Sequence, residues 1–390
     1  MEKVELFEKI NNTIEKAFTN MKQNEELKAI YEKNNYGSLE NDISELKKNI
    51  DIELKDCFKN IKEKERRKYN ISEGIYVNND NNRHDIFVII PIFNATDQQA
   101  EECIYSVIDN YIGLDYKLLI MSNRILKVFD IIKYKIPTYI YLKSKFSLPE
   151  AYNLMVGHAK EYSINDDSII SLMDDDAYIL TGQTEKVKEC YIRIKKDEYI
   201  ASSGHYYDIT PCATEFEKMI NQTHIQSFVS KYRKPYCHGG ASFMLKIKNF
   251  PHNGLPITGL GGISINILAI EKNKNKDRWF LYTDTDFVVY HPRKKNIFAW
   301  ITTYLSYEIA WNRALNMLSK EDLNIWKKKL DYDSKNRALG LQCNLKNKAQ
   351  RKYALGNIYL TQFLKPLLKE NLNYEEFKKY NVAVHGNLKQ

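Results

Sequence analysis

Between residues 86 and 173, short apolar runs alternate with longer segments that have the residue spacing of helices. Apolar runs of this length are typical of parallel strands that helices cover on both faces. The segments between them carry helix-start signals, with Thr96 or Asp97 placed as a cap and Pro149 in a first turn. The alternation predicts an α/β fold with a Rossmann-like, mostly parallel sheet flanked by helices. The four runs are IFVIIPIF (86–93), KLLIMSN (117–123), TYIYLKS (138–144) and SIISLM (168–173).

Helices are predicted at both ends of the chain. In the first 70 residues or so, apolar residues recur at spacings of three and four, which places them on one helical face. They are Leu6, Ile10, Ile14 and Phe18, followed by Ile43, Leu46, Ile50, Leu54, Phe58 and Ile61. The polar stretch NNDNNRHD (78–85) is typical of a linker. We therefore expect a helical N-terminal extension (1–83), a central α/β domain (84–296) and a helical C-terminal region (297–390).

The predicted helices at each end of the chain have more than one possible use. The N-terminal helices can pack on the central domain or on a second copy of the chain, which would make a homodimer. The aromatic and Lys-rich segment 297–330 can pack as ordinary helices, which is the simpler interpretation. It can also cover an acceptor site or touch a membrane surface.

Charge and cysteine usage exclude several classes of protein. The 390 residues carry a formal charge of +8, from 58 basic and 50 acidic residues that are interspersed along the chain. A nucleic-acid-binding protein would need a clustered basic face, so we expect no nucleic-acid partner. The six cysteines show no C-x-x-C spacing, which argues against a zinc knuckle or a disulfide framework and fits the reducing cytoplasm. The first residues lack the apolar core of a secretory signal, and no run of 18 apolar residues indicates a membrane span.

Three consecutive aspartates, Asp174, Asp175 and Asp176, follow the last of the four apolar runs. They therefore lie at the carboxyl end of a predicted buried strand, the edge where α/β sheets bind ligands. On an extended backbone Asp174 and Asp176 point to the same side and Asp175 points to the other. Two carboxylates on one side suit Mg²⁺ or Mn²⁺, which take their remaining ligands from phosphates and water. A solvated acidic turn is the alternative.

Two blocks of the sequence resemble family 2 glycosyltransferases. The block VIIPIFNATDQQAEECIYSVIDNY is similar to that family's opening strand, which ends in Pro-x-(Tyr/Phe)-Asn before a helix. The block SLPEAYNLMVGHAKEYSINDDSIISLMDDDAYI resembles its helix with Ala-x-Asn and its strand ending in Asp-x-Asp. The resemblance covers residues 86–180 and continues weakly to about 295. It implies a GT-A fold for 84–296, a nucleotide-sugar donor and a glycan or lipid-linked acceptor, with bacterial surface polysaccharide as the usual family product.

The resemblance also implies roles for individual residues. Asp174 would contact the ribose or the sugar, Asp176 would hold the metal that bridges the two phosphates, and His291 in FVVYHP would complete the metal site. A structural histidine before Pro292 is the alternative for His291. Asp175 is placed with the nucleotide-binding positions rather than with the metal ligands. The remaining positions expected around the nucleotide and donor are Pro91, Phe93, Asn94 and Asn153.

The sequence departs from the family in two places. Where the family has an acidic residue that recognises the base, this chain reads LLIMSN, so Ser122 or Asn123 would have to serve and either a UDP-sugar (favoured) or a GDP-sugar is compatible. Where inverting members have Glu-Asp, the stretch LPITGLGGISINILAI (255–270) contains no acid. The candidates for a general base are then Asp208, Asp284 and Asp286, or the enzyme has none, so the stereochemistry stays open. His238, beside two glycines, is a further candidate for the site.

Two other functions compete with glycosyl transfer. A nucleotidyltransferase of related fold normally has a Gly-rich loop with Arg after its first strand, and PIFNATDQQ has neither residue. A non-catalytic nucleotide- or sugar-binding scaffold would explain the missing Glu-Asp pair. The sequence favours a metal-dependent glycosyltransferase that works in the cytoplasm, with peripheral contact to the inner membrane face as an open possibility.

Overall fold

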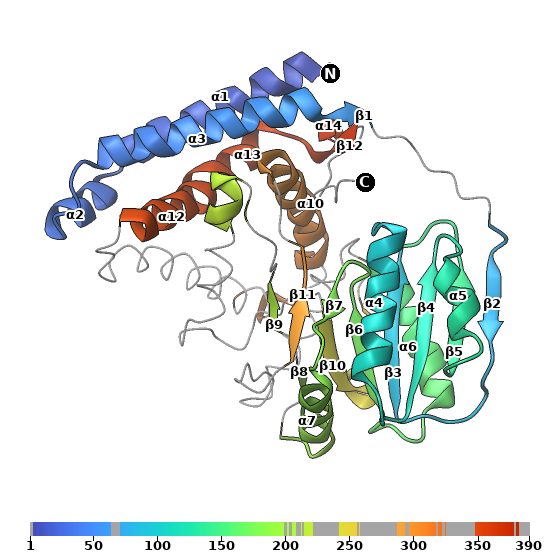
Figure 1. The fold of residues 1–390 in the computed structure, drawn as a ribbon. Helices are drawn as coiled ribbons and strands as arrows, with labels where there is room; N and C mark the ends of the chain where they lie inside the picture. Colours follow the sequence, from blue (N-terminus) through green and yellow to red (C-terminus); the bar gives the residue numbers. More distant parts are fainter. Residues whose placement is uncertain are drawn as a thin grey trace.

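The computed structural model of the chain describes residues 3–63, 71–198, 201–202, 205–207, 212, 214–220, 242–255, 257, 287–292, 296–316, 319–321, 324, 348–377 and 380–381. Two bodies are visible in Figure 1, a helical body built from both ends of the chain and an α/β body built around a sheet. The segment ISINILAIEK (263–272), whose apolar pattern predicts a helix, lies outside the described residues, and so does most of WFLYTDTDFVVYHP (279–292), which is typical of a strand pair or one long bent strand.

The α/β body contains a seven-stranded sheet of order β2-β5-β4-β3-β6-β10-β8. The four strands predicted from the apolar runs form its centre and are parallel to one another. Antiparallel strands extend the sheet on both sides. This confirms the predicted α/β class with a mostly parallel sheet. The strands are β2 (Gly74–Asn78), β3 (Ile86–Ile92), β4 (Tyr116–Ser122), β5 (Thr138–Leu142), β6 (Ile169–Met173), β8 (Ala201–Ser202) and β10 (Ser242–Lys246).

Helices cover both faces of the sheet, as the continuous apolar strands require. Val88 and Ile90 of β3 belong to the apolar cluster formed with α4 (Asp97–Asn110), α5 (Lys127–Ile132) and α7 (Thr184–Lys195). Phe87 and Ile89 of the same strand point to the other face, which α6 (Leu148–Tyr162) covers. Both α4 and α6 begin with a capping box, at Thr96 and Ser147. These caps set where each helix starts after its strand, and so where the intervening loops lie.

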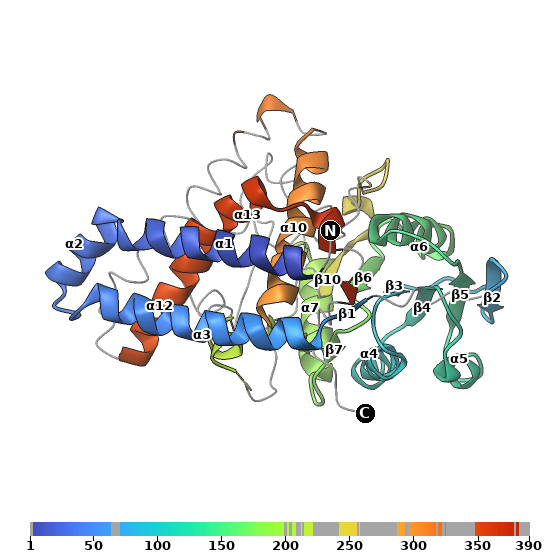
Figure 2. The same ribbon diagram turned by 90° about the horizontal axis from the view of Figure 1, so that it is seen from above.

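The helical body joins the two ends of the chain in one apolar core. The predicted apolar face of α1 (Lys3–Lys22) and α3 (Leu39–Asn60) is buried there against helices from the C-terminal region. Phe18 stacks on Tyr359 with ring centroids 4.0 Å apart, and Figure 2 shows α1 and α3 crossing the helices of the C-terminal region. The body also contains a helical segment from the middle of the chain, residues 215–220. Its other members are α2 (Glu25–Lys33), α10 (Ile297–Leu315), α12 (Lys348–Ile358), the π-helical turn Tyr359–Leu364, α13 (Lys365–Asn371) and α14 (Tyr374–Phe377).

The burial of this face bears on two predictions. The apolar face that could have served a homodimer is buried against other helices of the same chain. Dimerisation through these helices stays a prediction. The short strands β1 (Lys62–Glu63) and β12 (Tyr380–Asn381) pair and tie the two ends together again. The division at residues 83 and 296 also stays a prediction.

Three features of the described residues complete the fold. Strand β2 was not predicted; it pairs antiparallel with β5 at the sheet edge, directly before the predicted linker. Strands β7 (Tyr178–Ile179), β11 (Val288–Tyr290) and β9 (His205–Tyr207) form a second, three-stranded sheet. In the part of the chain that the structure describes, no helix has both the length and the apolar character needed to cross a membrane.

Candidate functional site

The aspartates lie in the turn between β6, which ends at Met173, and β7, which begins at Tyr178. Among the described residues, Asp174, Asp176 and His291 form a group whose possible ligand atoms all lie within 4.8 Å of one another. The Nε2 atom of His291 is 3.9 Å from Asp174 Oδ2 and 3.6 Å from Asp176 Oδ1. The structure therefore brings together the three residues for which the sequence suggested a metal site.

The second sheet explains how His291 reaches the aspartates from more than a hundred residues away. Strand β11 pairs antiparallel with β7, with Tyr290 opposite Tyr178, and these two rings stack 4.5 Å apart. His291 follows directly and so lies beside the turn that carries the aspartates. Helix α4 holds β7 in place, because the Ile179 N–H donates to Ser106 Oγ at 3.0 Å.

Two carboxylates and one imidazole are a suitable donor set for a divalent cation. Carboxylates suit Mg²⁺ and Mn²⁺ alike, and the imidazole favours Mn²⁺. The hydroxyl of the buried Tyr152 on α6 donates to Asp174 Oδ1 at 3.5 Å. Burial and the charges of Asp174 and Asp175 raise the pKa of Tyr152 well above its usual value, so it stays a donor. Such a contact orients a ligand carboxylate from behind.

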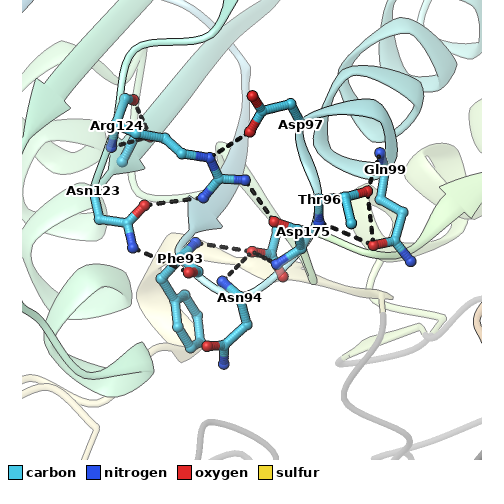
Figure 3. A network of polar contacts seen from close by, with 10 residues as sticks. Phe93, Asn94, Thr96, Asp97, Gln99, Asn123, Arg124 and Asp175 are labelled. Carbon is cyan, nitrogen blue, oxygen red and sulfur yellow. Dashed lines mark hydrogen bonds and ion pairs between the residues drawn. The ribbon is translucent and has the colours of Figure 1, made fainter. Parts of the chain in front are cut away.

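Asp175 points away from this group, as expected, although residues 174–177 form a turn closed by the Ala177 N–H and the Asp174 carbonyl (3.2 Å) and not the extended chain from which the orientation was predicted. Its Oδ2 atom accepts hydrogen bonds from the backbone N–H groups of Phe93, Asn94 and Ala95, at 2.8, 3.0 and 3.0 Å (Figure 3). Burial, and after it the charge of Asp176, raises the pKa of Asp175 to about 6, while the three N–H groups act in the opposite direction. Asp175 therefore joins the aspartate turn to the loop between β3 and α4.

Arg124 also binds this loop, through its carbonyl groups and side chains, and was not among the residues predicted for the site. Its Nη2 donates to the Ala95 carbonyl at 2.6 Å, its Nε to Asp97 Oδ1 at 2.7 Å and its Nη1 to Asn123 Oδ1 at 3.0 Å (Figure 3). Its side chain is only 5% exposed. The available signal was a cation directly after the apolar run 117–123, at the ligand edge of the sheet.

The two residues suggested for base recognition are engaged within the protein. Ser122 is fully buried, and its hydroxyl donates to the Arg124 carbonyl at 2.6 Å and accepts from the Arg124 N–H at 3.2 Å. The Asn123 side chain donates to the Phe93 carbonyl at 3.0 Å and accepts from Arg124. Both side chains shape the loop, and a role for either in base recognition stays a prediction.

The other positions predicted to line the nucleotide differ in their exposure to solvent. Pro91 is buried within β3, whereas Asn94 is exposed and Phe93 is half-buried. The ring of Phe93 lies edge-on to that of Phe146, with centroids 5.6 Å apart. Phe93 and Asn94 are thus the two that face outward, beside the turn that carries the aspartates.

Asn153 is hydrogen-bonded to the loop that contains Leu255. Its Nδ2 donates to the Leu255 carbonyl at 2.9 Å, and its Oδ1 accepts from the Leu255 N–H at 2.6 Å. Gly254 has a φ of +77°, and a Cβ there would lie 2.8 Å from the Asn153 amide. Contact of Asn153 with a donor stays a prediction.

Helix α10 contributes Tyr307 near the aspartates. Partial burial and the charges of Asp174 and Asp176 raise the pKa of Tyr307 to about 12, although its side chain is 41% exposed. The C-terminal region thus reaches the site. The proposed general bases Asp208, Asp284 and Asp286, and also His238, lie outside the described residues.

Comparisons with known proteins find distant similarity. No protein-family model and no curated protein matches the chain. Among solved structures, the chain is similar to the mannosyltransferase PcManGT from Pyrobaculum calidifontis, in complex with GDP-Man and Mn²⁺ (12% identity, TM-score 0.41, covering 74% of this chain and 90% of that one). It is also similar to TarS 1–349 of S. aureus in complex with UDP-GlcNAc (11%, 0.39, 78% and 97%). A third is glucosyl-3-phosphoglycerate synthase from Mycobacterium tuberculosis, with Mn²⁺, UDP and phosphoglyceric acid (11%, 0.39, 59% and 78%). These likenesses are too distant to transfer a substrate or a mechanism to this chain.

Proposed function

We propose that this protein is a metal-dependent glycosyltransferase that takes a sugar from a nucleotide-diphosphate donor. The observation that carries the proposal is the group of Asp174, Asp176 and His291, with possible ligand atoms within 4.8 Å, at the carboxyl end of β6. In α/β sheets this edge is where ligands bind. The loop after β3, which the family resemblance assigns to the nucleotide, lies directly against the aspartate turn.

The aspartate turn with His291 would bind the cation, and the neighbouring loop after β3 would bind the nucleotide. Asp174, Asp176 and His291 would hold Mn²⁺ or Mg²⁺, which when bound supplies positive charge to a leaving diphosphate. Tyr152 would keep Asp174 oriented for this task. The outward-facing Phe93 and Asn94 would line the nucleotide, Phe93 by contact with the base or ribose.

The backbone N–H groups of residues 93–95 are not a second phosphate site in this arrangement. All three donate to Asp175. Within the part of the chain that the structure describes, neutralisation of the diphosphate would therefore fall to the cation and not to these N–H groups. Asp208, Asp284 and Asp286 stay the proposed general bases, and the stereochemistry stays open.

The finer parts of the proposal follow from the resemblance. We infer a hexosyl donor linked to UDP, or else to GDP, and a glycan or lipid-linked acceptor of bacterial surface polysaccharide. We place the reaction in the cytoplasm, on or near the inner face of the membrane.

Calorimetry with UDP and with GDP, each with and without Mn²⁺, tests the proposal on the full chain. One of the two should bind with Mn²⁺ and lose most of its affinity when EDTA is added. Asp176→Asn should abolish this metal-dependent binding and the hydrolysis of the matching nucleotide sugar. Asp130→Asn, at an exposed ion pair on α5, is the matched control and should behave as the wild type. Metal-independent binding, or full activity of Asp176→Asn, would refute the proposal.

A further inference from the structure

Three consecutive backbone N–H groups converge on a single carboxylate oxygen just before a helix. They belong to Phe93, Asn94 and Ala95, and the acceptor is Asp175 Oδ2, at 2.8–3.0 Å. The N-cap Thr96 and helix α4 follow immediately. Successive N–H groups at such a place form a site for an anion, often a phosphate. Here the anion is a buried side chain of the protein itself, since Asp175 is 6% exposed.

Asp175 lies between the two aspartates of the candidate cation site. Its side chain points to the loop, while Asp174 and Asp176 point to His291. A bond that fixes the Asp175 carboxylate therefore also fixes the backbone from which its two neighbours project. We propose that Asp175 is a positioning residue that holds the cation ligands against the nucleotide loop without contacting the cation. The proposal rests on the function proposed above.

The loop can serve as a fixed support because it is held on its other side as well. Arg124 binds the Ala95 carbonyl at 2.6 Å, and Asn123 binds the Phe93 carbonyl at 3.0 Å. Figure 3 shows Arg124 and Asp175 both bonded to this loop segment. The N–H groups of the loop thus meet Asp175 while its carbonyl groups meet residues that follow β4. A shift of Asp175 would break its bonds to the N–H groups of residues 93–95, because the carbonyl bonds to Asn123 and Arg124 hold this segment in place.

Two variants separate position from charge. Asp175→Asn keeps an acceptor oxygen at the same place and loses the charge, whereas Asp175→Glu keeps the charge and moves the oxygens by one methylene. Loss of a group that orients metal ligands typically weakens metal affinity by about 10- to 100-fold. If position matters, the Glu variant should lose Mn²⁺ affinity in this range, and the Asn variant should lose clearly less. If only the charge matters, the Asn variant should lose more Mn²⁺ affinity than the Glu variant.

Binding of Mn²⁺ alone to the full chain, followed by calorimetry, is the first measurement, with Asp130→Asn as the control. A Glu variant that binds Mn²⁺ as the wild type does, or more tightly than the Asn variant, overturns the positioning role and leaves the proposed function standing. A wild type that binds Mn²⁺ neither alone nor together with UDP or GDP overturns both, and where Mn²⁺ binds only with a nucleotide the variants are compared in its presence. Should the Glu variant not fold, Asp175→Asn and Asp175→Ala decide, because both lack the charge and only Asn keeps the oxygen. Equal losses in these two overturn the positioning role.

A second measurement needs no cation. In Asp175→Ala the three N–H groups lose their internal anion, so inorganic phosphate should raise the thermal midpoint of this variant more than that of the wild type. The Asn variant, in which the oxygen stays, should respond as the wild type does. An equal response of the Ala variant and the wild type to phosphate would overturn the idea that Asp175 fills an anion site.

Discussion

Replacing Asn153 with Ala should destabilise the protein through a loop that is a hundred residues away in sequence. Asn153 makes two hydrogen bonds to the backbone of Leu255, at 2.9 and 2.6 Å. Leu255 is 2% exposed, so water replaces these bonds poorly. The neighbouring Gly254 has a φ of +77°, and its Cα faces the Asn153 amide.

The size of the effect follows from these contacts. Each lost hydrogen bond should reduce the free energy of unfolding by about 1 kcal/mol, and by up to about 2 kcal/mol where the Leu255 group stays unpaired. The better helix propensity of Ala returns up to about 0.7 kcal/mol. We therefore expect a net loss of about 1.5–3 kcal/mol. Leu154→Ala, at a side chain that is 45% exposed on the same helix, should change stability by less than about 0.5 kcal/mol.

A double-mutant cycle sharpens the test. Gly254→Ala alone should cost about 1–2 kcal/mol for the left-handed backbone, and more because its Cβ would meet the Asn153 amide at 2.8 Å. In the double variant this contact is gone, so the two losses should fall short of additivity by about 1 kcal/mol. Urea unfolding followed by circular dichroism measures each species. Additivity within about 0.5 kcal/mol, or an unchanged free energy of unfolding in Asn153→Ala, would refute a stabilising role for the two hydrogen bonds between Asn153 and Leu255.

The same variant also tests the role that the family resemblance implies. If Asn153 contacts the donor as well as Leu255, Asn153→Ala should weaken nucleotide-sugar binding more than Gly254→Ala does at equal loss of stability. Calorimetry on the two variants compares them directly. Equal losses of binding would show that Asn153 acts through its hydrogen bonds to Leu255 and not through a contact with the donor.

Three further predictions concern the loop support and the helical body. Arg124→Met should lower stability by about 2–3 kcal/mol through three lost hydrogen bonds, and Arg124→Lys should not restore it, because one ammonium cannot reach three separated acceptors; wild-type urea unfolding of the Lys variant would contradict this. Phe18→Ala should cost about 3–5 kcal/mol and speed hydrogen exchange in α12 and α13, since its ring stacks on Tyr359; unchanged exchange there would show that the two chain ends are not one unit. Burial, and to a lesser degree neighbouring carboxylates, raises the pKa of Glu53 from 4.5 to about 7. The folded state therefore binds more protons than the unfolded state between these values, and stability falls as pH rises through this window. Glu53→Gln should unfold at a higher urea concentration than the wild type at about pH 8 and show little difference at about pH 5; a constant difference would refute the assignment.

Much of the α/β body was predictable because its signals are local. Each apolar run from 86 to 173 became a central strand, and Thr96 and Pro149 mark helix starts as expected. The edge strand β2 escaped prediction, since its residues are mostly exposed and carry no burial pattern. The first 70 residues or so were expected to be helical; α1 to α3 end at Asn60, and their apolar face was identified correctly. Its partner was not identified, because an apolar helical face does not specify which surface will cover it.

The candidate site was predictable to different degrees for different residues. Asp174 and Asp176 do lie on one side, but not for the predicted reason: residues 174–177 form a turn, in which the Ala177 N–H donates to the Asp174 carbonyl at 3.2 Å, rather than an extended chain. Ser122 and Asn123 were correctly placed at the sheet edge, but the bonds that engage them come from Arg124 and Phe93. Such bonds depend on loop paths, and a single sequence carries no signal for them.

The sequence by itself determined the central strands and the place of the aspartates directly after one of them, since these depend on residue spacing and local apolar pattern. Only the tertiary structure decided which groups meet those side chains. His291 reaches the aspartates because β11 pairs with β7, and Asp175 meets three N–H groups because the β3–α4 loop passes beside it. The physical reason is that pairing and loop placement arise from contacts between segments far apart in the chain. The triplet of acids is therefore readable as a motif, but its division into two ligands and one support is a property of the fold.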